Sequence, residues 1–104
     1  MTEVDLVRLL RRHDLPPPLR QVRRVDARGR VRFLDAEWRR GDGTRLLLEV
    51  DGVGHLDEGT WYDDSLRAAE VVRQGETLVR LPARALRAEP GRVAELLRRH
   101  LGLV

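Results

Sequence analysis

The sequence predicts a single α/β domain, with a mixed four-stranded sheet flanked by helices, and three observations lead to this prediction. Residues 46–50 form a nearly continuous apolar run, which is typical of a strand buried on both faces. Apolar residues recur at helical spacing in three other segments, and glycine or proline separates neighbouring segments. A chain of 104 residues can bury one core without disulfides. We therefore treat residues 1–104 as one domain.

The first half of the chain indicates one helix followed by three antiparallel strands. Residues 2–13 have leucines at helical spacing, and residues 16–18 are three prolines that impose an extended connection. Residues 19–26 and 31–38 predict two strands joined by a turn at residues 27–29. Gly41 and Gly43 mark a second tight turn, after which the apolar strand begins.

The second half of the chain predicts a helix, a strand and a final helix. Thr60 and Asp63 resemble a helix start, and Gly75 ends that helix. We expect one stripe of it to face the core, namely Tyr62, Leu66, Ala69 and Val72. Residues 77–81 predict the fourth strand, and Pro90 starts the last helix. The predicted order is therefore αβββαβα.

All twenty basic residues are arginines, and the chain contains neither lysine nor cysteine. Arginine suits phosphate because its planar fork donates two hydrogen bonds, although GC-rich coding would give the same composition. The lack of cysteine excludes disulfides, thiolate zinc sites and cysteine nucleophiles. The apolar runs are too short to cross a membrane and no export signal precedes them, so we expect a cytoplasmic protein.

Three carboxylates lie where a buried strand normally has none: Asp35, Glu49 and Asp51. Glu49 and Asp51 are two apart, so both point to one face of their strand. Asp35 and Glu49 lie seven residues before and after Asp42, which places them nearly opposite in an antiparallel pair. Clustered carboxylates repel one another, and a bound Mg²⁺ or Mn²⁺ would relieve that repulsion. The alternative is that these acids flank turns and pair with arginines.

The whole set of motifs resembles the PD-(D/E)XK nucleases, and within them the bacterial domains similar to very-short-patch-repair endonucleases. The Phe-Leu-Asp segment ending at Asp35 is similar to the family's lone strand aspartate, and residues 49–52, Glu-Val-Asp-Gly, to its paired motif. His55 and residues 64–67, Asp-Ser-Leu-Arg, are similar as well, as are residues 78–81. The resemblance covers nearly the whole chain and implies a restriction-endonuclease-like core.

This resemblance implies a role for each residue of the acidic motifs. Asp35 and Glu49 would bind Mg²⁺ or Mn²⁺ directly, and the Val50 carbonyl and Asp51 would complete the metal site. The metal would activate a water that attacks a DNA phosphodiester. His55 would be the general base or a proton shuttle, because its ordinary pKa lies near neutral pH. The alternative for His55 is a solvated loop histidine.

Two arginines are candidates for phosphate contact, and two tryptophans are not. Arg80 would lie in the last strand beside the acids. Arg67 and Asp64 would either form a local pair on the helix or approach the acids from it. Trp38 and Trp61 are expected to pack in the core or at its rim and not to stack on bases. DNA is the expected partner, and the chain could form a homodimer or belong to a larger polypeptide.

One departure from the family pattern bears on activity. The lysine that the family has two residues after the glutamate is Asp51 here, and the chain has no other lysine to replace it. We therefore predict a metal-dependent DNA endonuclease, with two alternatives. The first is an inactive nucleic-acid-binding or regulatory module, such as the C-terminal part of an antitoxin-like protein. The second is a structural domain whose acids pair with arginines.

Overall fold

The computed structural model describes residues 2–52 and 58–103, and its elements follow the predicted order with one addition. The elements are α1 (Thr2–Arg12), β1 (Leu19–Val25), β2 (Val31–Arg39), β3 (Arg45–Asp51), α2 (Glu58–Glu70), β4 (Glu76–Pro82), α3 (Ala83–Ala88) and α4 (Pro90–His100). The addition is α3, a short helix that follows β4 without a break. The predicted α/β class with a mixed four-stranded sheet is confirmed.

The four strands lie in the order β1-β2-β3-β4. The first three are antiparallel neighbours, and β4 runs parallel to β3 because α2 forms the crossover between them. Arg39 pairs with Arg45, which centres the β2–β3 turn on Asp42 as predicted. Gly43 in this turn has φ +88°, a conformation that glycine adopts without strain.

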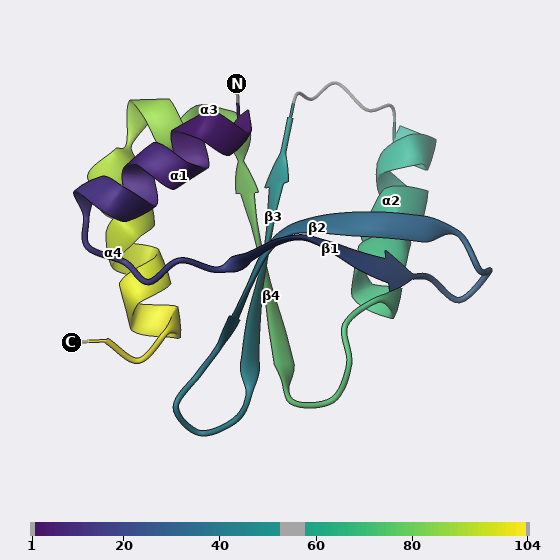
Figure 1. Ribbon diagram of the computed structural model, residues 1–104. Coiled ribbons are helices and arrows are strands. Elements are labelled where there is room, and N and C mark those ends of the chain that lie inside the picture. Colours follow the sequence, from purple (N-terminus) through teal and green to yellow (C-terminus); the bar gives the residue numbers. More distant parts are fainter. Residues whose placement is uncertain (1, 53–57, 104) are drawn as a thin grey trace.

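Helices cover both faces of the sheet, but unequally. Figure 1 shows α1, α3 and α4 grouped on one side and α2 alone on the other. Leu46 and Leu48 belong to the larger core under the three helices, whereas Leu47 belongs to a small core under α2. All three leucines are fully buried, which confirms that β3 is buried on both faces. Trp38 also lies in the larger core and donates its indole N–H to the Pro16 carbonyl at 2.7 Å.

The predicted orientation of α2 is wrong. Tyr62 and Leu66, expected in the core, are 64% and 49% exposed, and Trp61 is 59% exposed. Ala68 and Val71 are buried instead. The reason is electrostatic, because the inner side of α2 also carries the charged residues that pair with the sheet, and the apolar stripe is turned outward.

The strand β2 changes faces at Asp35. Leu34 packs in the core under α2, whereas Ala36 packs in the core under α1, although residues two apart in a regular strand share a face. In β1 the residue opposite this point, Gln21, has φ +54°, which is uncommon for a non-glycine residue. The pairing register is the same on both sides of this bend. The hairpin of β1 and early β2 therefore extends over α2 (Figure 1).

Candidate functional site

The predicted acidic residues of the strands lie toward the C-terminal end of β3. The regular β2–β3 pairs end at Ala36 and Leu48, so Asp35 and Glu49 occupy the next position of each strand. Asp35 does not continue the ladder through its backbone. Its Oδ2 accepts a hydrogen bond from the Val50 backbone N–H at 2.6 Å. Asp35 thus satisfies a β3 donor at the point where β2 bends away.

Glu49 is held by an arginine from the neighbouring strand. Arg32 donates from Nη2 to Oε1 of Glu49 and from Nε to its Oε2, the latter at 3.3 Å. Both side chains are largely buried. This two-point contact fixes the plane of the carboxylate and engages both of its oxygens.

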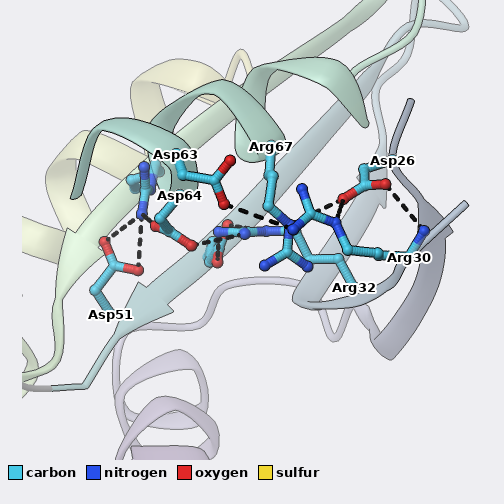
Figure 2. A network of polar contacts seen from close by, with 9 residues as sticks. Asp26, Arg30, Arg32, Asp51, Asp63, Asp64 and Arg67 are labelled. Atoms are coloured by element: carbon cyan, nitrogen blue, oxygen red, sulfur yellow. Dashed lines mark hydrogen bonds and ion pairs between the residues drawn. The ribbon is translucent and has the colours of Figure 1, made fainter. Parts of the chain in front are cut away.

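Asp64 of α2 joins this pair to a second arginine. Its Oδ1 accepts from Arg32 Nη1 at 2.9 Å (Figure 2), and its Oδ2 accepts from Arg80 Nη2 at 2.7 Å. Arg80 also donates to Asp51 at 3.2 Å. The five residues form one continuous arrangement of three carboxylates and two guanidiniums, which we call the β3 cluster: Arg32, Glu49, Asp51, Asp64 and Arg80. Of the two positions that the sequence left open for Asp64, a local pair with Arg67 or an approach to the strand acids, its contacts with Arg32 and Arg80 correspond to the second.

The carboxylates near the end of β3 differ in acidity. Burial raises the pKa of Glu49 even though Arg32 acts against the rise. Burial also raises the pKa of Asp35, with a smaller contribution from repulsion by Asp51, while the Val50 N–H opposes it. The hydrogen bond from Arg32 lowers the pKa of Asp64. Asp64 is thus stabilised as an anion, whereas the two strand acids are costly to keep charged.

Arg67, a predicted phosphate ligand, is engaged with a carboxylate that was not predicted. It donates from Nε to Asp26 Oδ2 at 2.9 Å (Figure 2), and Asp26 also accepts the backbone N–H groups of Arg28 and Arg30 at 2.9 Å. Burial alone would raise the pKa of Asp26, but these hydrogen bonds lower it to about 2. Aspartate commonly accepts backbone N–H groups of a turn that follows it, so Asp26 before the Ala-Arg-Gly turn is the sequence signal that could have predicted these hydrogen bonds.

A further buried ion group lies on the same face of the sheet. Arg24 donates to Glu76 at 2.6 Å and to Glu37 at 3.2 Å, and the Arg24 and Glu76 side chains are only 3% and 4% exposed. Sequence analysis did not identify this group, because its members are 13 and 52 residues apart and no local pattern joins them. Asp63, predicted to mark a helix start, lies inside α2, and its carboxylate is 3.6 Å from Arg30.

The described residues do not fit a metal centre. Among residues 2–52 and 58–103, no three histidine, aspartate or glutamate side chains are placed to hold one ion. The physical reason is that Glu49, Asp51 and Asp64 face arginines, while Asp35 faces a backbone N–H. His55, the predicted general base, lies outside the residues that the structure describes. We therefore assign no metal-dependent step to these side chains.

Comparisons with protein-family models, curated proteins and solved structures find no match for this chain. The structure itself defines the class, an α/β protein with a mixed sheet in which β3 and β4 are parallel. Within its described part, no helix is long and apolar enough to cross a membrane.

Proposed function

We propose that the chain is a nucleic-acid-binding domain with a restriction-endonuclease-like core that binds without cutting. The observation that supports this most is the β3 cluster, in which Arg32 and Arg80 neutralise the carboxylates that a metal ion would need. A guanidinium balances charge, but it does not generate hydroxide from a bound water as a metal ion does. Asp51 also stands where the nuclease family has its lysine.

The placement of the remaining arginines supports nucleic acid as the partner. The chain carries a net charge of +3. Among the residues that the structure describes, Arg8, Arg11 and Arg12 of α1 form no ion pair with a carboxylate, although all three are exposed. Unpaired arginines attract phosphate and release its counterions on contact, which is the main source of sequence-independent affinity.

A metal-dependent DNA endonuclease is the second candidate, with Mg²⁺ or Mn²⁺ as its cofactor. The specific observation in its favour is electrostatic, because burial, with a smaller contribution from the charge of Asp51, raises the pKa of both Asp35 and Glu49. A cation among these three carboxylates would relieve that repulsion. For this function, Arg32 and Arg80 would have to release their carboxylates to the ion.

One set of measurements separates the two candidates. Mg²⁺ and Mn²⁺ are titrated calorimetrically into wild type, Glu49→Ala and the control Glu95→Ala, an exposed surface position on α4. Plasmid nicking and oligonucleotide binding are measured on the same preparations. We expect oligonucleotide binding in all three proteins, with neither specific metal binding nor nicking.

Two results would contradict the proposal. Metal binding and nicking that are present in wild type and in Glu95→Ala, and lost in Glu49→Ala, would establish the endonuclease instead. A wild-type protein that binds no oligonucleotide at low salt would remove nucleic acid as the partner.

A further inference from the structure

On the α1 side of the sheet, no helix of the described residues covers the β1–β2 hairpin beyond the bend at Asp35 (Figure 1). Beyond the bend at Asp35, the strand pairs Arg23 with Phe33 and Val25 with Val31 lie on this side, because the neighbouring β2 residues Leu34 and Arg32 point to α2. All four of these side chains are exposed, and that of Phe33 is 55% exposed. An aromatic ring on an open strand face, next to an arginine, is therefore presented to solvent.

Helix α1 borders the start of β1 at Arg20, three residues before Arg23 of the open face. A groove of about 1100 Å³ runs between α1 and the start of β1, and its lining includes Arg8, Arg11, Arg12 and Arg20. Arg20 is on the same side of the sheet as Phe33, because its cross-strand partner Ala36 packs in the core under α1. One acidic residue, Glu3, belongs to the lining, and it lies 3.3 Å from Arg20.

The charge of this surface determines what it can bind. Four arginines and one glutamate line the groove, and Arg23 adds a fifth positive charge on the adjoining strand. The buried arginines of the sheet, such as Arg24 and Arg32, are instead paired with glutamates, so their charge is neutralised. The groove is therefore a basic surface whose charge is not balanced locally, and a polyanion is the complementary ligand.

We propose that the α1 groove and the open strand face bind single-stranded nucleic acid. In this arrangement, which rests on the proposed function, Arg8, Arg11 and Arg12 contact successive phosphates and Phe33 stacks on a base. Single strands are favoured because their bases can leave the stack and lie on an exposed aromatic ring, whereas duplex bases cannot. The β3 cluster takes no part in this contact.

Fluorescence anisotropy with labelled oligonucleotides tests the assignment. Single-stranded DNA, single-stranded RNA and a DNA duplex of equal length are titrated with wild type, Arg8→Gln/Arg11→Gln and Phe33→Leu at several salt concentrations. The matched control is Arg92→Gln/Arg99→Gln, which removes the same charge from exposed positions on α4. Circular dichroism verifies that each variant is folded.

We expect the α1 variant to bind single strands at least about tenfold more weakly and to flatten the plot of log K against log salt by about 1.4, since each lost phosphate contact accounts for about 0.7. Phe33→Leu should lose about five- to hundredfold on single strands, the range of one base stack, and change little on duplex. The control pair should match wild type within about twofold at moderate salt, where distant charges are screened.

The possible failures are distinguishable. If wild type binds and the α1 variant and Phe33→Leu bind equally well, the proposed function stands and this location is wrong. Preference of wild type for duplex, with no effect of Phe33→Leu, would overturn the single-strand class. If wild type binds no oligonucleotide, the proposed function fails together with this inference.

Discussion

The two faces of the sheet are built on different physical principles. Under α1, α3 and α4 the contacts are apolar, with Leu46 and Leu48 fully buried. Under α2 the apolar core is small, and ion pairs connect the helix to the strands, among them Arg32 with Asp64 and Arg67 with Asp26. Apolar burial is non-directional, whereas a buried ion needs its particular partner. Stability on the α2 face therefore depends on complete sets of charges.

The largest effect is expected from Arg24→Ala, which tests whether the ionic face needs all its partners. This change leaves Glu76 and Glu37 buried without their cation, and we expect a loss of about 3–5 kcal/mol in the free energy of unfolding. Urea denaturation measures it. The double variant Arg24→Leu/Glu76→Leu should recover most of the loss, because an apolar pair needs no charge balance. A change below about 0.5 kcal/mol in Arg24→Ala would show that this ion group is not structural.

On the face of the sheet under α1, α3 and α4, we expect a similar loss in the free energy of unfolding, caused by lost apolar burial. Leu48→Ala removes a fully buried side chain and should cost about 2–5 kcal/mol through lost burial and the cavity left behind. Leu66→Ala, at an exposed position of α2, is the control and should change stability by less than about 0.5 kcal/mol. Equal costs for the two variants would mean that the outward orientation of α2 is wrong.

A moderate effect is expected from Glu49→Ala, and its sign distinguishes two views of the β3 cluster. If Arg32 and Glu49 form a structural pair, the variant leaves Arg32 with Asp64 alone and loses about 1–3 kcal/mol. If the acids mainly repel one another, the same variant becomes more stable than wild type without metal. Thermal unfolding in a chelator separates these outcomes, with Glu95→Ala as the surface control.

The smallest effect is a difference in acid sensitivity. Because the folded pKa of Asp26 is lowered from 3.8 to about 2, its contribution to stability is complete above pH 3.8 and is lost as the pH falls toward 2. The lowered pKa values of Asp64 and Glu76 act in the same direction, whereas the raised values of Asp35 and Glu49 oppose it. Asp26→Asn should therefore lose less stability than wild type over this interval. Parallel urea titrations at each pH would reveal it, and identical pH slopes would contradict the assignment.

Local patterns in the sequence predicted much of the fold. The turn at Asp42 and the two-sided burial of β3 followed from glycine placement and a continuous apolar run. The orientation of α2 could not be obtained in this way, because its apolar stripe has the usual helical spacing. What reverses it is the pairing of Asp64 with Arg32 and Arg80, residues 32 and 16 positions away. Such partners become visible only once the strands are assembled.

For the candidate site, the sequence predicted the position of the acids but not their arginine partners. Strand alternation and the hairpin register placed Asp35, Glu49 and Asp51 near the end of β3. Which arginines pair with these acids could not be predicted. Every basic residue is an arginine, and no local pattern distinguishes the buried ones from the exposed ones. Arg80 was expected to contact phosphate, yet its guanidinium binds Asp51 and Asp64.

The bend at Asp35 also has a consequence for cooperativity. Because β2 changes faces there, it supplies Leu34 to one core and Ala36 to the other, and β3 likewise supplies Leu47 and Leu48. Neither core can be assembled from an independent piece of chain. The two layers should therefore unfold together in one transition, and the hydrogen-exchange rates of β2 amides on both sides of the bend should report the same global opening.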